Sequence, residues 1–363
     1  MNVLHVVGAR PNFMKNAPVI REMARFPEVF NQLLVHTGQH YDPMMSQIFF
    51  EELDLPRPDV NLEVGSGSHA WQTAEVMLRF EPVLLEYQPD WVIVVGDVNS
   101  TLACSLVCSK LGVQVAHVEA GLRSHDRGMP EEINRILTDH VSDLLFTPSE
   151  DANHNLYEEG ISQDKIHLIG NVMIDTLVQL LPKAEMRWTD LKQKYGLGQF
   201  ILVTLHRPSN VDDPSTLDEI MSALVEISEE VAVLFPVHPR TRLRIQQSNL
   251  PIKGRNLLIL DPLGYLDFLS LQAHAALVLT DSGGLQEETT YLGIPCLTAR
   301  PNTERPVTIS MGTNQLVESK AGSLKTAIRQ RLDETVPTGK RPPLWDGHAA
   351  ERIVQVFRKF QPI

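Results

Sequence analysis

The two halves of the sequence contain the same pattern of apolar runs followed by polar turns and helical segments. Short runs rich in Val, Ile and Leu alternate with amphipathic helical segments from end to end. In the first half, VLHVVGARP places an arginine directly after an apolar run, and ILVTLHRPS repeats that arrangement in the second half. DWVIVVGDVNSTLA and AALVLTDSGGLQEE form another such pair. Alternating strands and helices predict a parallel sheet with helices on both faces. We therefore expect an α/β protein with two Rossmann-like domains.

The expected strands divide evenly between the halves. In the first half they are residues 3–7, 33–37, 91–95, 113–118, 144–147 and 166–169. In the second half they are residues 200–205, 231–237, 257–260, 276–280, 295–297 and 315–317. A length of 363 residues suits two domains. We expect them at residues 1–170 and 171–345, with Gly170–Asp175 as the crossing and a helix within 346–363 packing back on the first domain. Because open α/β sheets bind ligands at the carboxyl ends of their strands, two sheets facing by those ends would form a cleft.

Composition narrows the class of protein. Hydrophobic residues make up 43% and charged residues 21%, as in globular domains. A net charge of −13 argues against broad binding to nucleic acid or to an anionic membrane. No apolar run approaches the ~18 residues that span a bilayer. The start MNVLHVVGARP is typical of a first strand rather than a signal peptide, so we expect a cytoplasmic protein. Cys104, Cys108 and Cys296 fit buried small hydrophobes better than metal or redox work.

A local basic site could still hold an anionic ligand. GARPNFMK places Arg10 and Lys15 in the turn after the first strand and in the following helix. A helix N-terminus and a guanidinium group both favour phosphate. The motif has a single glycine, so it is neither the GxGxxG fingerprint nor a P-loop. A solvated basic pair remains the structural alternative.

The segment TDSGGLQEE offers a second phosphate site. Adjacent glycines, Gly283 and Gly284, let backbone N–H groups approach a diphosphate, while Ser282 can cap the helix or donate to an oxygen. Glu288 lies one helical turn further and could accept hydrogen bonds from ribose hydroxyls. The alternative is an ordinary serine cap followed by a solvated helix face.

Several acid–base groups also follow expected strands. Asp97 and Glu119 each come directly after an apolar run, Glu131 lies in the loop after Glu119, and His206 with Arg207 follows the first strand of the second half. Each could be a helix cap, an ion-pair partner or a buried structural histidine. Together they line the expected cleft, where crowding of negative charge would raise carboxyl pKa values and suit general acid–base catalysis.

A metal or cofactor is not expected. His117 and Glu119 form a two-residue H-x-E pair, but no third ligand stands at a recognisable spacing. The dinucleotide fingerprint is absent as well. Side-chain acids and bases would then carry the reaction.

At these motifs the chain resembles the non-hydrolysing UDP-N-acetylglucosamine 2-epimerases. The resemblance covers nearly the whole chain, through GARPNFMK, TGQH, GDVNSTLA, HVEAGLRS, MPEEINR, HRPSN, PVHPRT, TDSGGLQEE and TERP. It implies a GT-B-type fold, a homodimer and interconversion of UDP-GlcNAc and UDP-ManNAc at C2. In the family's route UDP is eliminated from C1 to give 2-acetamidoglucal, and UDP adds back after C2 is protonated on the other face. The resemblance also suggests a role in making precursors of bacterial surface polysaccharides.

The resemblance implies roles for individual residues. Proton transfer and sugar positioning fall to Asp97, Glu119 and Glu131, and His206 lies near the diphosphate. Nucleotide binding falls to Arg10, Lys15, Ser282, Gly283, Gly284, Glu288 (ribose) and Arg305 of TERP, with Phe268 and Leu263 near the base. Gln39, Arg207 and His238 lie in matched motifs and are also expected to bind substrate.

Two departures leave the substrate and its regulation open. The segment 39–46 differs from the Arg-x-x-Leu-Asp-Gln pattern with which many bacterial members hold a regulatory UDP-GlcNAc. Whether substrate activates this protein allosterically therefore stays open. That segment and VGSGSH (residues 64–69) also resemble a branch acting on UDP-2,3-diacetamido-2,3-dideoxyglucuronic acid, whereas TERP favours the simpler substrate. The motifs are also compatible with a hydrolysing epimerase, a glycosyltransferase or a non-catalytic nucleotide-sugar sensor.

Overall fold

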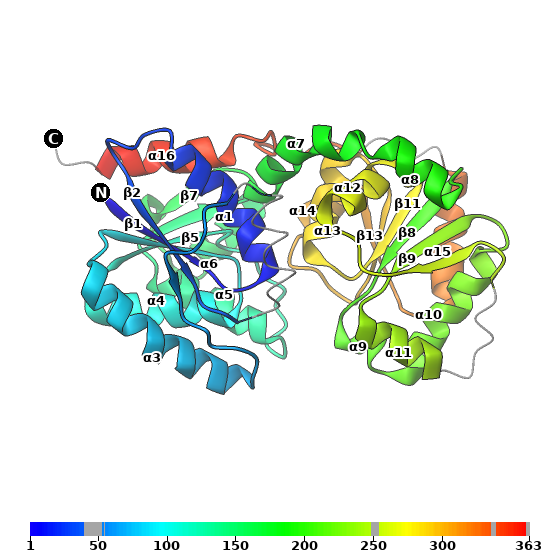
Figure 1. Ribbon diagram of the computed structural model, residues 1–363, viewed down its shortest axis with the longest axis horizontal. Helices are drawn as coiled ribbons and strands as arrows, with labels where there is room; N and C mark the ends of the chain where they lie inside the picture. Colours follow the sequence, from blue (N-terminus) through cyan, green and yellow to red (C-terminus); the bar gives the residue numbers. More distant parts are fainter. Residues whose placement is uncertain (40–52, 54, 248–253, 335–338, 361–363) are drawn as a thin grey trace. The chain divides into compact units, whose positions relative to one another are not determined.

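The computed structural model describes residues 1–39, 53, 55–247, 254–334 and 339–360. The chain divides into two compact units, Met1–Gln179 with Pro343–Ile363, and Leu180–Pro342. Helix α7 (Val172–Glu185) runs through the first of these divisions (Figure 1). The sequence interpretation placed the two crossings after residue 170 and after residue 345.

The first unit is built on a parallel sheet in the order β3-β2-β1-β4-β5-β6-β7. Its strands are β1 (Asn2–Val7), β2 (Asn31–His36), β3 (Val60–Asn61), β4 (Trp91–Val95), β5 (Gln114–Val118), β6 (Leu144–Thr147) and β7 (Ile166–Leu168). After β1 the chain builds outward through β2 and β3, and it then returns to β4 on the other side of β1. The crevice between β1 and β4 is therefore the topological switch point of this sheet.

Helices cover both faces of the first sheet. They are α1 (Arg10–Met23), α3 (His69–Tyr87), α4 (Asn99–Leu111), α5 (Pro130–Val141), α6 (Glu150–Glu158) and α16 (Ala349–Phe357), with 3₁₀ turns η1 (Gln163–Lys165) and η2 (Arg358–Phe360). Side chains alternate across a strand, so Ile93 packs with α1 and α16, whereas Val92 and Val94 pack with α3 and α4. This two-faced burial explains why β4 is apolar throughout.

The final helix belongs to the first unit. The N–H groups of Ala349 and Ala350, at the start of α16, donate to the two carboxylate oxygens of Asp175 on α7 at 3.1 and 2.7 Å. The indole N–H of Trp345 donates to the carbonyl of Pro148 at 2.9 Å. The terminal helix expected within 346–363 is thus α16 with η2, while residues 361–363 lie outside the described ranges.

The second unit repeats the plan with a parallel sheet in the order β10-β9-β8-β11-β12-β13. Its strands are β8 (Phe200–Thr204), β9 (Ala232–Pro236), β10 (Leu257–Leu260), β11 (Leu277–Thr280), β12 (Cys296–Ala299) and β13 (Asn314–Val317). Its helices are α8 (Trp188–Tyr195), α9 (Pro208–Val211), α10 (Pro214–Ile227), α11 (Pro239–Gln247), α12 (Tyr265–His274), α13 (Gly283–Leu292), α14 (Val307–Ser310) and α15 (Ala321–Asp333). The switch point here lies between β8 and β11.

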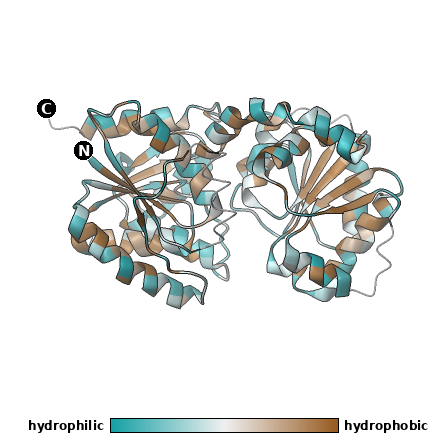
Figure 2. Ribbon diagram, viewed as in Figure 1, coloured by the Kyte–Doolittle hydropathy of each residue, from teal (hydrophilic) through white to brown (hydrophobic). Residues whose placement is uncertain are grey.

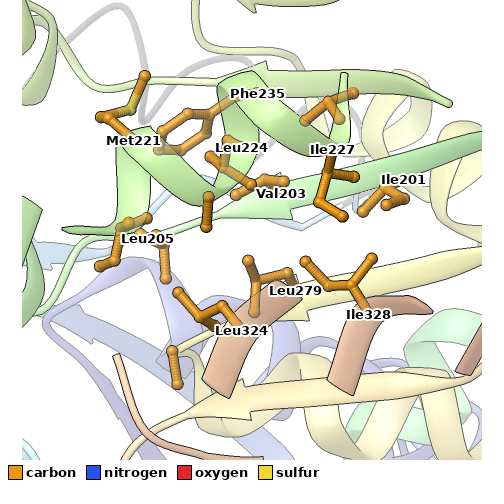
Figure 3. Close-up of a cluster of buried hydrophobic side chains, with 14 of the residues drawn as sticks. Ile201, Val203, Leu205, Met221, Leu224, Ile227, Phe235, Leu279, Leu324 and Ile328 are labelled. Carbon is orange, nitrogen blue, oxygen red and sulfur yellow. The ribbon is translucent and has the colours of Figure 1, made fainter. Parts of the chain in front are cut away.

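The main core of the second unit fills the space between its sheet and two helices. Val203 and Leu279 point from β8 and β11 toward Leu224 on α10 and toward Leu324 and Ile328 on α15 (Figure 3). Figure 2 shows the strands of both sheets mainly in hydrophobic colours, whereas the helices mix hydrophobic and hydrophilic residues. Apolar strands with half-polar helices are the expected layers of a doubly wound fold.

The α/β fold with two parallel sheets is confirmed, and β3 and β12 are among the places where the strands differ from those expected. β3 was not expected, because a two-residue edge strand leaves no periodic pattern in the sequence. The strand expected at residues 295–297 begins and ends later, so that Cys296 is the first residue of β12. All three cysteines are buried and free. Among the described residues, no helix is both long and apolar enough to cross a bilayer.

Candidate functional site

The polar motifs of each unit gather at the switch point of its own sheet. In the first unit, the turns after β1 and β4 carry the GARP and GDVN segments, and the neighbouring β5 delivers Glu119. In the second unit, the turns after β8 and β11 carry His206 and the Ser-Gly-Gly segment. These are the positions at which open parallel sheets hold ligands.

Lys15 and Glu119 form a buried ion pair in the first unit. Their side chains are 7% and 5% exposed. Glu119 directly follows β5 and has a left-handed backbone conformation, with φ of 72°. Gly96 makes room for the pair, because a Cβ there would lie 2.9 Å from Nζ of Lys15 and 3.3 Å from Oε2 of Glu119. Lys15 was expected to hold nucleotide, and in this structure it contacts a catalytic candidate.

Asp97 is held by an arginine that the sequence analysis did not single out. The guanidinium of Arg135 on α5 donates to Oδ2 of Asp97 at 2.5 Å and to Oε2 of Glu132 at 2.8 Å. Glu132 in turn accepts the N–H groups of Ser124 and His125 at 2.9 and 2.8 Å. Burial alone would raise the pKa of Glu132, but the hydrogen bonds from Ser124 and the charge of Arg135 outweigh it and hold that pKa below its usual range.

Three of the expected site residues line one pocket of about 250 Å³ in the first unit. Gln39, Asp97 and Glu131 all contribute to its wall. The other lining residues are Ser66, Gly67, His69, Gln72, Val98, Asn99, Pro130 and Asn134. Gln39 is also structural, since its amide oxygen accepts hydrogen bonds from the N–H and hydroxyl of Ser100 on α4 at 3.1 and 2.7 Å.

Two carboxylates that the sequence placed near a substrate are thus already paired with cations. Asp97 pairs with Arg135, and Glu119 pairs with Lys15. Crowding of negative charge, the reason given for raised carboxyl pKa values, is offset locally by these two partners.

Arg10 is the first residue of α1, so its backbone lies at the helix N-terminus after β1. Residues 40–46 of the segment that departs from the bacterial pattern lie outside the described ranges.

The second unit fixes His206 by its backbone and its ring. Asp281 is fully buried at the end of β11, and its carboxylate accepts the N–H groups of His206 and Arg207. Oδ1 of Asp281 lies 2.9 Å from Nδ1 of His206. Burial would raise the pKa of Asp281, but His206 and the amide of Asn210 outweigh it and keep that pKa low. The His206 side chain is 60% exposed, so its ring remains accessible to a ligand.

The Ser-Gly-Gly turn opens α13. Ser282 is the N-cap residue, Gly283 begins the helix and Gly284 follows it. First-turn N–H groups have no acceptor within their own helix, so this end favours an anion. The Ser282 side chain makes no capping hydrogen bond, contrary to one of the two roles considered for it.

A compact group of charges lies beside this turn. The guanidinium of Arg305 pairs with Glu287 at 2.8 Å and also with Glu304, which pairs with Arg300 at 2.7 Å. Gly283 lies directly against Arg305, since a Cβ at Gly283 would come within 2.3 Å of Nη1 of that arginine. The first turn of α13 and the Arg305 guanidinium therefore lie next to each other.

The remaining expected ligands also belong to the second unit. Glu288 is buried on α13 and accepts a hydrogen bond from the Tyr265 hydroxyl at 2.9 Å. Leu263 and Phe268 are half-buried against the core near the start of α12. His238 is exposed between β9 and α11, so it stands at a strand's carboxyl end like the other candidates.

Residues that hold the site were harder to find from sequence than residues that point into it. Arg135, Asp281 and Tyr265 were missed because each supports a candidate from a different element. The sequence did contain a signal for Asp281, because it lies between an apolar strand and the glycine pair, at the carboxyl end of that strand. Among the described residues, no group of three or more His, Cys, Asp or Glu side chains could hold a metal ion.

Comparison with known proteins adds an independent line of evidence. The family model described as UDP-N-acetylglucosamine 2-epimerase matches residues 22–358. A UDP-N-acetylglucosamine 2-epimerase of Methanocaldococcus jannaschii is 43% identical over 366 residues, covering 98% of this chain and 99% of that protein. A UDP-2,3-diacetamido-2,3-dideoxy-D-glucuronate 2-epimerase of Pseudomonas aeruginosa is 42% identical over 365 residues, covering 99% of this chain and all of that protein.

A solved structure is similar to this chain in both fold and sequence. The crystal structure of the Methanocaldococcus jannaschii enzyme in complex with UDP-GlcNAc and UDP has a TM-score of 0.90 and 43% identity. The match covers 99% of this chain and 100% of that one. Both parallel sheets therefore have counterparts in a protein that binds a sugar nucleotide.

Proposed function

Because the chain belongs to the UDP-N-acetylglucosamine 2-epimerase family, we propose that it interconverts UDP-GlcNAc and UDP-ManNAc at C2. The observation that carries the proposal is the arrangement of carboxylates in the first unit. Asp97 and Glu131 line one pocket, and Glu119 lies beside Gly96, the residue before Asp97. Such a group can remove a proton from one face of a sugar carbon and return a proton to the other.

The chemistry proceeds by elimination and addition. A carboxylate takes the C2 proton while the C1–O bond breaks, its electron pair leaving with UDP and a C1=C2 double bond forming as 2-acetamidoglucal. In the return step, C2 receives a proton on the opposite face and the β-phosphate oxygen of UDP adds to C1. The leaving diphosphate needs electrostatic stabilisation. The α13 N-terminus with Arg305, and the exposed imidazole of His206, have the chemistry to supply it.

The related substrate carrying a uronate and a second acetamido group is the main alternative, because the Pseudomonas aeruginosa relative acts on it and is 42% identical. The first-unit pocket favours the neutral sugar. Its lining includes the carboxylates of Asp97 and Glu131, with His69 as the one basic side chain among the described lining residues. A uronate carboxylate placed there would meet the like charge of Glu131, whereas the charge of Asp97 is offset by Arg135.

Isotope exchange tests the proposal directly. The protein is incubated with UDP-GlcNAc in D2O, and the sugar is followed by NMR. We expect deuterium at C2 together with a mixture of UDP-GlcNAc and UDP-ManNAc. Free sugar would indicate hydrolysis, and turnover only with an added acceptor would indicate a glycosyltransferase. No deuterium with UDP-GlcNAc, but incorporation with the diacetamido-uronate, would move the assignment to that substrate.

We further propose that the enzyme is a cytoplasmic homodimer that supplies surface-polysaccharide precursors. The buried free cysteines support a reducing compartment. The outer face of α3 supports a dimer, because Trp71, Leu78 and Leu85 are 43%, 66% and 60% exposed. Their seven-residue spacing places them on one side of the helix. An exposed apolar stripe of this kind is typical of an interaction surface.

Light scattering after gel filtration tests the dimer. The double substitution Leu78→Glu with Leu85→Glu should halve the mass if this stripe lies in the interface. Met186→Glu is the control, because Met186 is 76% exposed on the second unit and should not affect assembly. A wild-type monomer, or a double variant that remains dimeric, would contradict the proposed interface.

A further inference from the structure

His117 is a buried histidine with both ring nitrogens engaged. It lies on β5, two residues before Glu119, and is fully buried. Its Nε2 lies 2.8 Å from the carbonyl oxygen of Gly96, and its Nδ1 lies 2.6 Å from Oδ1 of Asp139 on α5. A carbonyl oxygen only accepts hydrogen bonds, so Nε2 must carry a proton and donate it.

Asp139 fixes the other side of the ring. Its second oxygen accepts the N–H of Gly121 at 3.1 Å and pairs with Arg123 at 2.8 Å. Burial would raise the pKa of Asp139, but His117 and Arg123 outweigh it and hold that pKa below its usual value. Nδ1 of His117 therefore lies against a carboxylate whose other oxygen is held by Gly121 and Arg123. Arg123 also pairs with Glu159 through two contacts.

Gly96 connects this network to Asp97. Its backbone is left-handed, with φ of 68°, and its N–H donates to the carbonyl of Val118 at 3.0 Å. Its carbonyl is the group that His117 holds. The next residue, Asp97, offers its own carbonyl to Asn134 at 2.9 Å and its carboxylate to Arg135. Hydrogen bonds to the carbonyls of Gly96 and Asp97 thus hold the turn that presents Asp97 to the pocket.

We propose that His117 is a positioning residue of the epimerase reaction: by donating from Nε2 to the Gly96 carbonyl, it fixes the turn that aims the Asp97 carboxylate into the pocket shared with Glu131. The inference rests on the proposed function. It assigns His117 no contact with substrate. Displacing a reacting group by about 1 Å can lower the rate on the order of 100-fold, so loss of this hydrogen bond should appear in kcat.

Two substitutions separate the two hydrogen bonds of the ring. In His117→Gln the amide nitrogen takes the place of Nε2 and can still donate to Gly96. In His117→Asn the shorter side chain places its amide nitrogen near the position of Nδ1, so it reaches Asp139 but not Gly96. We expect His117→Asn to lose about 100-fold in kcat and His117→Gln to retain most of it. UDP affinity by calorimetry should be unchanged in both variants.

His5 provides a matched control. It is also fully buried in the first sheet, with Nδ1 3.0 Å from the Asn16 amide oxygen and Nε2 3.0 Å from that of Gln32. The same two substitutions at His5 should give equal kcat values. If kcat of the His117 variants is also equal, or follows their melting temperatures as it would for a purely structural residue, the positioning role is wrong.

A measurement without turnover separates this inference from the proposed function. In ¹⁵N-histidine NMR spectra, Nε2 of His117 should have the chemical shift of a protonated nitrogen, because it donates to the Gly96 carbonyl. An unprotonated Nε2 would overturn this hydrogen bond and the inference with it. An enzyme inactive on UDP-GlcNAc whose His117 carries the Nε2 proton would remove the proposed function while retaining the hydrogen bond.

Discussion

The ammonium group of Lys15 on α1 pairs with the carboxylate of Glu119 at the end of β5, and both side chains are almost fully buried. The pair joins the helix after the first strand to the loop that carries a catalytic candidate. Removing one member of a buried pair takes that counter-ion away from the other charge, which is costly in a region with little water. The pair therefore links the stability of the first unit to the geometry of its site.

We expect Lys15→Met to lower the free energy of unfolding by about 3 kcal/mol, because Glu119 would keep a buried charge. The double variant Lys15→Met with Glu119→Gln should recover part of that loss. Urea titration followed by circular dichroism measures both. The control is Arg25→Met, which removes a surface pair with Glu22 at the end of α1 and should cost little stability, because Arg25 is exposed to water. A double variant no more stable than Lys15→Met alone would argue against the pair.

Asp97→Asn should nearly abolish epimerisation. The side chain keeps its shape but loses the ability to take or give a proton, so kcat should fall by about 100- to 10,000-fold. Calorimetry should show UDP affinity unchanged. Asp143→Asn is the control, because Oδ2 of Asp143 accepts the N–H of Val115 at 2.9 Å near the start of β5, away from the strand ends that carry the site. An Asp97→Asn enzyme within a few-fold of wild type would remove Asp97 from the reaction.

The fold was predictable because the pattern of an apolar strand followed by a polar turn recurs along both halves of the chain. Apolar runs such as β4 and β8 are strands buried on both faces, and each is followed by a turn carrying polar residues. The edge strand β3 could not be predicted, since a two-residue pair depends on its neighbour β2 for definition. The exact extent of β12 likewise depends on register with β11 and β13.

The site was predictable only in part, for a related reason. Asp97, Glu119 and Ser282 follow strands directly, so their places can be deduced from local sequence. Arg135 lies on α5 and reaches Asp97 across 38 positions of sequence, which no local pattern reports. The H-x-E spacing suggested only a possible metal ligand at His117. It gives no information about the actual partners of the ring, which are Asp139 and the Gly96 carbonyl.

Docking of the terminal helix should depend on pH through Asp175. Burial raises the pKa of Asp175 to about 6, despite the opposing N–H donors of Ala350 and Ala349. The folded protein then holds this proton more tightly than the unfolded chain, whose carboxyl titrates near 3.8. The contribution of Asp175 to the free energy of unfolding is therefore greatest below pH 3.8, and it falls as the pH rises toward about 6.

Melting curves of wild type and Asp175→Asn between pH 4 and 8 isolate this contribution. His5, whose pKa is lowered to about 4 by burial, has the opposite dependence in the same range. The difference between the two proteins removes that background. The melting temperature of wild type relative to Asp175→Asn should fall from pH 4 to pH 7. A constant difference would show that Asp175 does not titrate in this window.

Gly283→Ala should weaken nucleotide binding without disturbing the fold. The added methyl group would lie 2.3 Å from Nη1 of Arg305 and 2.7 Å from Oε1 of Glu304, so the guanidinium must move away from the start of α13. Arg305 is held by Glu287 and Glu304, and this limits how it can adjust. We expect UDP to bind about 10-fold more weakly by calorimetry, which corresponds to about 1.4 kcal/mol. Gly322→Ala on α15 is the control, because its Cβ would meet nothing within 4 Å and UDP affinity should not change. Equal affinities for the two variants would separate the Ser-Gly-Gly turn from the nucleotide.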